Sequence, residues 1–230
     1  MQVPEKTRKL IIVGNSAFAE IAHEYFMYDS DYEVVAFSVE RGFLKADELR
    51  GLPVVPFDEL IARYAPGEHS IYVACTYTKL NRLRTRLAMA AKAQGYALAS
   101  YVSSRAFVWR NVELGEHCFI FENNVVQPFV KLGNNVVLWS GNHIGHHSII
   151  RDNVFIASHV VVSGFCDIGA NCFVGVNATF ANNVTLGRDC LVGAGATILK
   201  NADAEGLYGA KQTEIKNRSP LEYFGVAEGE

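Results

Sequence analysis

Histidine side chains gather in one short stretch of this 230-residue chain. Four of the seven histidines lie at positions 143–159, and two of them, His146 and His147, are adjacent. An imidazole titrates near neutral pH and can take the proton of an attacking amine or hydroxyl group. We expect His146 to be such a general base and His147 to orient it or to contact the substrate. His159 stays open between a ligand contact and a surface residue, whereas His117 and His143 are expected to be ordinary polar residues.

A second group of polar residues follows apolar runs in the first part of the chain. The runs at 9–13, 32–39 and 70–75 each end in small or polar residues. Ligands of a parallel α/β sheet bind where the strands end. The first of these turns has a single glycine and no GxGxxG sequence, so a generic turn and a ligand loop remain equal alternatives there. The candidate ligand-binding residues at these ends are Gly14, Asn15, Ser16, Glu40, Thr76 and Lys79.

Alternating strand and helix patterns must position these residues. Four apolar runs, at 9–13, 32–39, 70–75 and 96–102, predict buried strands. One helical pattern follows the first run, a second begins near Pro56, and a third fills 78–93. The third helix has a basic face, which is either solvated or binds a nucleotide diphosphate. Such alternation predicts a parallel, Rossmann-like sheet over residues 1–103.

An internal repeat of six residues runs from Ala106 to Asn201 without insertion. The third position of all 16 hexads is apolar, the fourth is Gly in seven, and the sixth is Asn in eight. A period of six fits neither a helix nor a two-faced strand, but it fits a short strand followed by a corner. Positions one and three should face inward, and the corners should contain residues that tolerate positive φ, such as Gly and Asn.

Three such sides make an 18-residue coil, and stacked coils make a parallel β-helix. The hexapeptide period is typical of the left-handed β-helix, which we expect over residues 104–204, with a tail at 205–230. Residues 18 apart then lie in one column. One predicted corner column contains His117, Asn135, Asn153, Asn171 and Asp189.

The same register identifies the neighbours of the histidine pair. Gly164 lies one coil beyond His146, where its N–H is the candidate donor to the oxyanion of an acyl transfer. Phe129 and Phe165 lie one coil on either side of His147 and are suited to an interface between copies of the chain. No two histidines are 18 or 36 residues apart, and zinc needs three or four ligands at one place, so the spacing predicts no metal site.

Composition excludes several classes of function. The net charge of −3 argues against a nucleic acid or a membrane surface as the main partner. No apolar run approaches the roughly 18 residues that span a bilayer, and the first residues lack the pattern of a secretory signal. We therefore expect a cytoplasmic protein with reduced thiols. The five cysteines have no CxxC spacing, which argues against zinc and disulfides, and the four in the repeat are expected to be small core residues.

A Rossmann-like half followed by a hexapeptide helix resembles the bacterial sugar acyltransferases of the sialic-acid O-acetyltransferase, bacillosamine-pathway N-acetyltransferase and perosamine N-acetyltransferase type. The resemblance extends from Lys9 to about Lys211. Its most specific part is HHSIIRDNVFI at 146–156, which matches the stretch that begins with the family's catalytic histidine. Two positions depart from the family, because His147 stands where an acidic residue is usual and Arg151 where glycine is usual.

The resemblance implies an acetyl-CoA-dependent N-acetyltransferase that acts on the amino group of a nucleotide-linked amino sugar, without a metal. It implies a homotrimer whose N-terminal domain holds the nucleotide sugar and whose CoA lies along the β-helix between subunits. The residues expected in catalysis are His146, His147 and Gly164. Those expected to contact CoA are His159, Gly164, Gly193, Gly195 and Lys211, with Lys216 and Arg218 further along the tail.

Two alternatives remain open. One is a sugar O-acetyltransferase or a transferase of a longer acyl group. The other, of a different class, is a non-catalytic trimer that binds sugar nucleotides, and the histidine at position 147 keeps this alternative open. Release of thiol from acetyl-CoA separates the enzymes from the scaffold.

Overall fold

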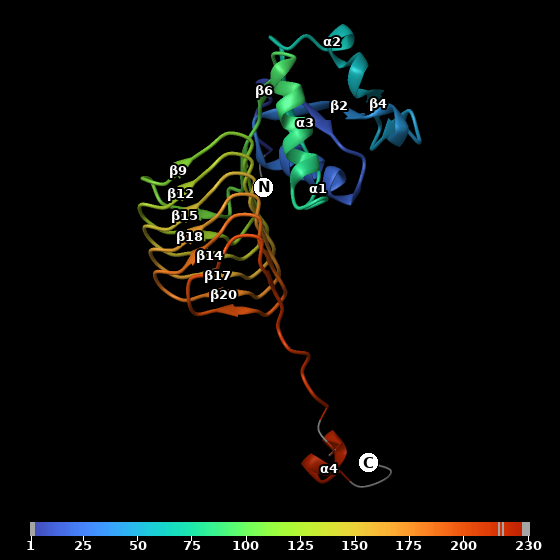
Figure 1. Cartoon of the computed structure of the whole chain (residues 1–230). Coiled ribbons are helices and arrows are strands. Elements are labelled where there is room, and N and C mark those ends of the chain that lie inside the picture. Colours follow the sequence, from blue (N-terminus) through green and yellow to red (C-terminus); the bar gives the residue numbers. More distant parts are fainter. Residues whose placement is uncertain (1–2, 216, 218, 227–230) are drawn as a thin grey trace.

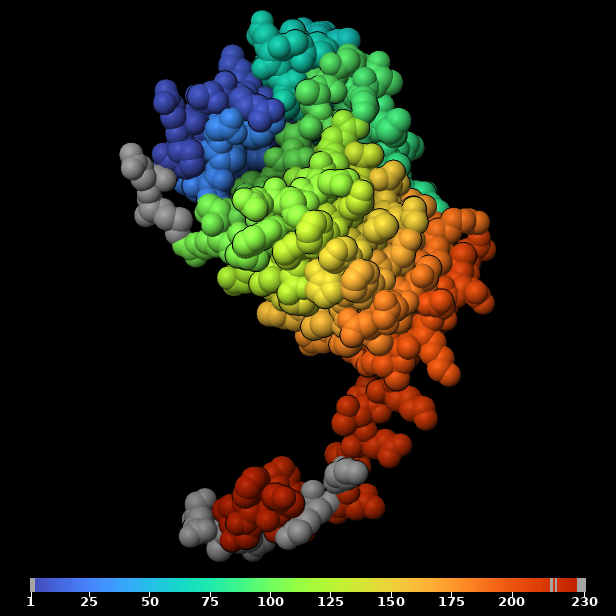
Figure 2. Space-filling model, turned by 90° about the vertical axis from the view of Figure 1, so that its left-hand side faces the viewer, coloured from blue at the N-terminus to red at the C-terminus, as the bar shows by residue number. Residues whose placement is uncertain are grey.

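Two regular arrangements follow one another along the chain (Figure 1). The computed structural model describes residues 3–215, 217 and 219–226. An α/β layer built by the N-terminal part lies at the upper end of the molecule, and a three-sided coil of short strands extends below it. Figure 2 shows the coils as stacked layers, whose colour changes from green to orange with distance from the N-terminal layer.

The N-terminal sheet has six strands in the order β3-β4-β2-β1-β5-β6. Its central strands are the predicted apolar runs. They are largely buried, which is typical of parallel strands between two layers of helices. All neighbours pair in parallel except β3 and β4, so the predicted Rossmann-like sheet is confirmed. The strands are β1 (Arg8–Val13), β2 (Tyr32–Val39), β3 (Glu48–Leu49), β4 (Leu52–Pro56), β5 (His69–Val73) and β6 (Ala97–Leu98).

The sheet differs from the sequence prediction at β3 and β4, which were not predicted, and at the last predicted strand. Strand β4 is absent from the prediction, because Pro53 and Pro56 interrupt the apolar residues and proline gives no N–H to a ladder. The sheet tolerates both prolines, since only the two-residue strand β3 lies beyond β4. The predicted strand at 96–102 divides in two: β6 pairs with β5, whereas β7 (Tyr101–Val102) pairs with β10 (Phe119–Ile120) of the β-helix.

Helices cover both faces of this sheet. α1 (Ala17–Asp29) packs on one face, in a core that includes Leu10 and Ile12 of β1. α3 (Arg82–Ala93) packs on the other face, in a core that includes Ile11 and Val13. The alternation of side chains along β1 thus supplies both cores. The remaining short helices are η1 (Arg41–Phe43), η2 (Phe57–Glu59) and α2 (Leu60–Arg63).

The β-helix has three parallel faces, each built from every third strand, and we call the turns that follow them the first, second and third corners. The first face contains β7, β10, β13 (Val137–Leu138), β16 (Phe155–Ile156), β19 (Phe173–Val174), β22 (Leu191–Val192) and β24 (Leu207–Tyr208). The second contains β8 (Phe107–Val108), β11 (Val125–Val126), β14 (His143–Ile144), β17 (Val161–Val162), β20 (Thr179–Phe180) and β23 (Thr197–Ile198). The third contains β9 (Glu113–Leu114), β12 (Lys131–Leu132), β15 (Ile149–Ile150), β18 (Asp167–Ile168) and β21 (Thr185–Leu186).

The register of the β-helix is the predicted one. Each pairing within a face joins residues 18 apart, except the last, between β22 and β24. The first and third hexad positions fill the core, which confirms the hexapeptide β-helix. Four cysteines lie buried there among Val, Ile and Leu side chains, as expected of small core residues: Cys118, Cys166, Cys172 and Cys190.

The corners are formed by the sixth hexad position. From His117 to Asp189 every residue at this position has a φ between 57° and 78°, which confirms the expected left-handed conformation. The same expectation is wrong for the glycines at the fourth position, whose φ is not positive. A Cβ atom at Gly145 would lie 2.6 Å from the backbone nitrogen of Gly164 on the next coil, so these glycines allow the coils to stack closely.

The N-terminal layer packs directly on the first face of the β-helix. Phe18 of α1 and Tyr72 of β5 share one buried core with Phe119 and Phe155 of the first face. The ring centroid of Phe119 is 5.7 Å from that of Phe18 and 5.1 Å from that of Tyr72. Because this core is continuous, the layer is fixed to the first face, and the second corner is the vertex opposite it.

A ladder of side-chain hydrogen bonds runs along the third corner, in the predicted column. Its steps measure 2.8 to 3.1 Å and join each side chain to that of the next coil. The N–H of Val73 donates to Nε2 of His117 at 2.8 Å, so the ring proton of His117 is on Nδ1 and is donated into the ladder. The members in order are His117, Asn135, Asn153, Asn171 and Asp189.

Protonation of His117 opposes folding. Burial lowers the pKa of His117 to about 3, and its Nε2 atom already accepts a hydrogen bond. The unfolded chain binds this proton at the usual histidine pKa of 6.5. Above pH 6.5 this histidine therefore leaves the free energy of unfolding unchanged. As the pH falls from 6.5 to 3, we expect it to reduce the free energy of unfolding by about 1.4 kcal/mol per pH unit.

Denaturant unfolding at pH 6.5 and pH 5 measures this effect as a loss of about 2 kcal/mol. His117→Asn should remove that part of the pH dependence while keeping a residue suited to the corner conformation. His69→Asn, at the start of β5, is the matched control and should retain it. An unchanged pH dependence in the His117 variant would contradict the prediction.

The described tail leaves the β-helix after β24 as an extended segment and ends in α4 (Pro220–Phe224) (Figure 1). Ser219 and Glu222 cap the start of α4. Among the described residues, no helix has both the length and the apolar character needed to traverse a bilayer.

Candidate active site

His146 and His147 lie side by side at the second corner, between β14 and β15. Both side chains are exposed, and their Nδ1 atoms are 3.1 Å apart, within hydrogen-bonding distance. When His146 supplies the shared proton, its Nε2 atom has a free electron pair. The described residues include no other hydrogen-bond partner for the His146 ring. The pair is thus arranged so that His146 can accept a proton at Nε2.

Two aromatic rings hold His147. Its ring stacks on Phe129 at a centroid distance of 4.6 Å and on Phe165 at 4.8 Å. The predicted column of these three residues is therefore present, and both phenylalanine side chains remain more than half exposed. The stack fixes the plane of the His147 ring, and with it the direction from which Nδ1 of His147 reaches His146.

Gly164 leaves space for the ring of His146. A Cβ atom at this position would lie 2.8 Å from Cε1 and 2.9 Å from Nε2 of His146, which is too close. The N–H of Gly164, the candidate oxyanion donor, donates to Oδ1 of Asn182 at 2.9 Å in this structure, so it must leave that partner before it can meet an oxyanion. Asn182, one coil further on, was not singled out in the sequence, and its position 18 residues after Gly164 is the signal that identifies it.

A pocket of about 230 Å³ lies at the ends of β1, β2 and β5. Its inner wall is apolar and its mouth is polar, a combination typical of small-molecule sites. Lys79 is not among its lining residues, although the loop that contains Lys79 borders it. The pocket brings together the other five predicted residues: Gly14, Asn15, Ser16, Glu40 and Thr76.

The inner wall consists of residues that the sequence analysis did not select. They are apolar residues at the ends of the strands, on η1 and on the side of α3 that faces the sheet. The sequence signal that could have identified them is their position just before, or opposite, the polar residues that follow the strands. The mouth thus presents N–H and side-chain groups that can form hydrogen bonds, and the wall presents apolar area. The apolar lining residues are Val13, Val39, Ala74, Leu83 and Leu87, together with Phe43, which is 58% exposed.

Charged and polar groups surround the mouth of this pocket. Arg86 of α3 donates to both carboxylate oxygens of Glu40, at 2.9 and 2.8 Å, and lowers the pKa of that carboxyl. The side chain of Ser16, the residue before α1, makes no capping hydrogen bond, so it and the first N–H groups of the helix can face a ligand. Burial raises the pKa of Cys75 to about 11, and the thiol stays neutral.

The pocket and the histidine pair of one chain lie on different sides of the β-helix. The pocket belongs to the layer that covers the first face, whereas His146 and His147 are at the opposite corner. One copy of the chain therefore does not bring the two groups of predicted residues together.

The predicted CoA contacts fall on two corners. The ring of His159 lies over Gly141 at the first corner, where a Cβ atom would be 2.7 Å from it. Gly193 and Gly195 lie further along the same corner, whereas Gly164 lies at the second. Both corners border the second face, so a ligand along that face reaches either of them.

Two further predictions concern the tail and metals. Lys211 is exposed in the tail, whereas Lys216 and Arg218 lie outside the described residues. In the part of the chain that the structure describes, no three His, Cys, Asp or Glu side chains are grouped so that they could hold a metal ion.

Comparison with known proteins identifies the repeat and the fold. Residues 129–164 and 165–200 match the family model of the bacterial transferase hexapeptide (six repeats). No curated protein sequence matches the chain.

Solved structures match over nearly the whole chain. The acetyltransferase domain of PglB from Neisseria gonorrhoeae, in complex with acetyl coenzyme A, has a TM-score of 0.78 and 24% identity, over 88% of this chain and 96% of that one. PerB from Caulobacter crescentus, in complex with CoA and GDP-perosamine, has a TM-score of 0.76 and 23% identity, over 91% and 97%. WeeI from Acinetobacter baumannii has a TM-score of 0.67 and 20% identity, over 87% and 96%. Residues 129–200 therefore have the repeat of the bacterial transferase hexapeptide model, and the chain as a whole shares the two-part fold of these structures.

Proposed function

We propose that the protein transfers the acetyl group of acetyl-CoA to the amino group of a nucleotide-linked amino sugar. The observation that carries the proposal is the exposed ring of His146, which lies over Gly164 and is paired through Nδ1 with His147. The likeness to the PglB domain bound to acetyl coenzyme A and to PerB bound to CoA and GDP-perosamine supports this donor and this acceptor. The match to the transferase hexapeptide model supports acyl transfer as the reaction.

His146 is the general base in this proposal. The amine nitrogen of the sugar attacks the thioester carbonyl carbon, and Nε2 of His146 takes one proton from the nitrogen. The carbon–sulfur bond then breaks, and His146 gives the proton to the sulfur, which leaves as the thiol of CoA. An amide remains on the sugar, and His146 is again neutral. His147 accepts at Nδ1 from His146 and so keeps Nε2 of His146 free for the incoming proton.

The two substrates occupy different parts of the chain. The nucleotide lies in the pocket of the N-terminal domain, residues 1–103, where Asn15, Ser16 and Thr76 face it from the mouth. CoA lies along the β-helix domain, residues 104–204, between the corners of His159 and His146. Lys211, in the tail at 205–230, supplies a cation for the phosphates of CoA.

Each active site joins two copies of the chain. The pocket and His146 of one copy are on opposite sides of the β-helix, so a sugar held in the pocket meets the base of a neighbour. The exposed rings of Phe129 and Phe165 beside His147 offer that neighbour an apolar surface. A homotrimer with cyclic symmetry repeats this contact and closes.

Purified protein is expected to release thiol from acetyl-CoA only when a nucleotide-linked amino sugar is present. The test uses a panel of UDP-, GDP- and TDP-linked 4-amino-4,6-dideoxy sugars, with the corresponding 4-hydroxy sugars as matched controls. A thiol-reactive dye follows the reaction, and mass spectrometry identifies the product with one added acetyl group. Acetylation of the hydroxy sugars would identify an O-acetyltransferase instead, and nucleotide-sugar binding without thiol release would reject an enzyme in favour of a scaffold.

A further inference from the structure

Arg84 of α3 is fully buried, yet no carboxylate pairs with it among the described residues. Its Nε atom donates to Oδ1 of Asn135 at 2.8 Å. Its Nη1 atom donates to the carbonyl oxygen of Thr76 at 2.9 Å and to Oδ1 of Asn81 at 3.2 Å. Its Nη2 atom faces backbone carbonyl oxygens of the third corner. Every one of these acceptors is neutral.

The guanidinium of Arg84 keeps its charge inside the protein. Burial lowers the pKa of Arg84 to about 10, which is still well above neutral pH. The ionisable groups that act on it are Tyr72, Cys75 and Cys118, and burial raises the pKa of each, so all three are neutral near pH 7. No anion therefore compensates the positive charge, whose Cζ atom lies 5.7 Å from the ring centroid of Phe155. A buried charge without an anionic partner destabilises a fold unless other interactions offset it.

The guanidinium lies directly behind one wall of the nucleotide pocket. It draws the carbonyl oxygens of Cys75 and Thr76, at 3.4 and 2.9 Å, away from the pocket that both residues line. In a trans peptide the N–H points opposite to the C=O, so the N–H groups of Thr76 and Tyr77 point away from Arg84. Neither N–H has a hydrogen-bond partner within the described residues.

The next part of this loop has an unusual backbone. Lys79, Leu80 and Asn81 have successive positive φ values of 52°, 50° and 66°. The predicted helix at 78–93 therefore begins only at Arg82, since a left-handed turn cannot continue into a right-handed helix. Such strain persists only where the surroundings hold the segment in place, and it is common at ligand sites.

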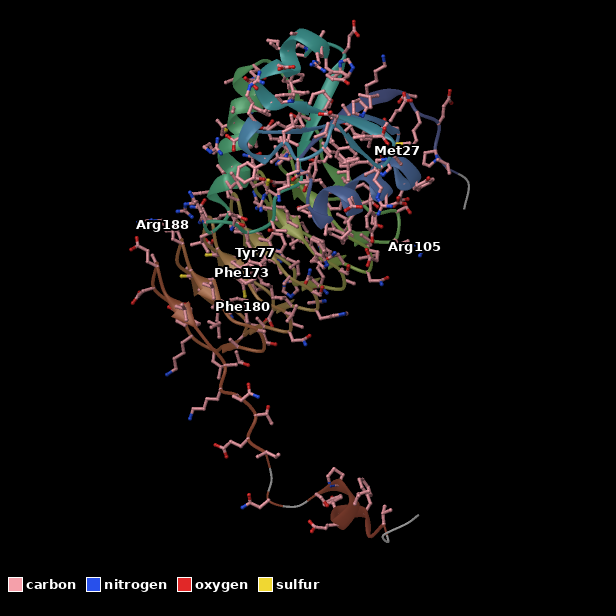
Figure 3. The ribbon with its side chains drawn as sticks, turned by 90° about the vertical axis from the view of Figure 1, so that its right-hand side faces the viewer. Met27, Tyr77, Arg105, Phe173, Phe180 and Arg188 are labelled. Carbon is pink, nitrogen blue, oxygen red and sulfur yellow. The ribbon has the colours of Figure 1, made fainter. Side chains whose placement is uncertain are left out.

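The β-helix is what holds the loop. Nδ2 of Asn81 donates to the carbonyl oxygens of Asn171 and Cys172, both at 3.1 Å. The ring of Tyr77 packs on that of Phe173, with centroids 4.3 Å apart, and Figure 3 shows the two side chains together at the contact between the two parts. The N–H groups of Thr76, which lines the pocket, and of Tyr77, the next residue, are thus kept in a fixed direction.

We infer that Arg84 makes this pocket selective for anionic ligands, with a phosphate of a nucleoside diphosphate bound at the N–H groups of Thr76 and Tyr77. The inference rests on the proposed function, because the diphosphate is the part of a nucleotide sugar that bears negative charge. Arg84 does not touch the ligand. It is a positioning residue that orients two peptides and places a positive charge behind them, in a region of low dielectric. Thr78 in the pocket and the exposed Lys79 add donors on the same loop.

The test compares nucleoside diphosphates with their uncharged nucleosides. Calorimetry at one salt concentration measures the affinities of UDP, GDP and TDP against uridine, guanosine and thymidine. The unmodified protein is expected to bind at least one diphosphate about tenfold or more tightly than its nucleoside. Arg84→Met should abolish most of this ratio, and Arg84→Lys should restore part of it. A merely structural role would weaken both ligands equally and leave the ratio unchanged.

Arg82→Met is the matched control, because Arg82 lies on the same helix, is exposed and pairs with Asp189. Hydrogen–deuterium exchange on the unmodified protein gives a test that does not depend on the folding of a variant. The diphosphate that binds should protect the amides of Thr76 and Tyr77, and its nucleoside should not. Unprotected amides or an unchanged ratio in Arg84→Met would overturn the inference and leave the proposed acetyl transfer standing. A protein that binds none of the diphosphates would overturn the inference together with the proposed nucleotide site.

Discussion

Replacement of His146 by asparagine is expected to lower kcat/KM for acetyl transfer by about 10²–10⁴. The ring is exposed above Gly164, and its Nε2 atom has no partner in the described part of the chain, so it is the group that can take the amine proton. Asparagine is polar and similar in size but has no basic nitrogen. Steady-state kinetics at saturating acetyl-CoA measure the loss, which should shrink at high pH, where the amine is already deprotonated.

His69→Asn is the control for this substitution and should leave kcat/KM unchanged. CoA binding and the oligomeric state of the His146 variant should also be unchanged, because an exposed corner side chain contributes little packing. His147→Asn keeps the corner conformation, which Asn183 adopts at the same corner with φ 63°. This variant should lose less kcat/KM than the His146 variant if His147 only orients His146, and as much if the two histidines act as a unit. A loss below about tenfold in the His146 variant would reject the general-base role.

Purified mixed trimers of two inactive variants are expected to recover about a third of the wild-type activity. Ser16→Trp fills the mouth of the pocket at a residue whose side chain makes no capping bond, and His146→Asn removes the base. Since the pocket and His146 of one copy lie on opposite sides of the β-helix, each working site takes its pocket from one copy and its base from the next. Every mixed trimer, whether it contains one or two copies of either variant, places an intact pocket beside an intact base at about one contact of three.

The two variants are co-expressed with different tags, and the mixed species is purified through both tags before thiol release is measured. Light scattering on each parent confirms beforehand that it assembles as the unmodified protein does. A site contained within one copy predicts no recovery, because every copy then has one defective half. Activity no higher than that of the parents would therefore refute the shared site.

The hexad pattern by itself determined the β-helix and its columns. An apolar residue at the third position of each hexad and a corner residue at the sixth predict the coil and its register. They also predict the stack of Phe129, His147 and Phe165. Local sequence is sufficient here because each strand pairs with the residues one coil further along, so no choice among distant partners remains open. The apolar runs of the first part determined the ends of the strands in the same way, and hence five of the pocket residues.

Individual hydrogen bonds at the corners were decided only by the folded structure. The Gly164 N–H is donated to Asn182, and that contact depends on a side-chain rotamer that the six-residue period does not specify. The fourth-position glycines likewise turned out to serve close stacking, because the distance between coils, and not the local backbone conformation, excludes a Cβ atom there.

The placement of the two parts was also decided by tertiary packing. In the sequence, Arg84 is one member of a basic helical face, and it is buried because α3 packs against the third corner. The outward rings of Phe119 and Phe155 are covered by the N-terminal layer, and this contact is what places His146 at the corner opposite the pocket. Such contacts join segments far apart in the chain and depend on the complementary shape of whole surfaces, which no local period encodes.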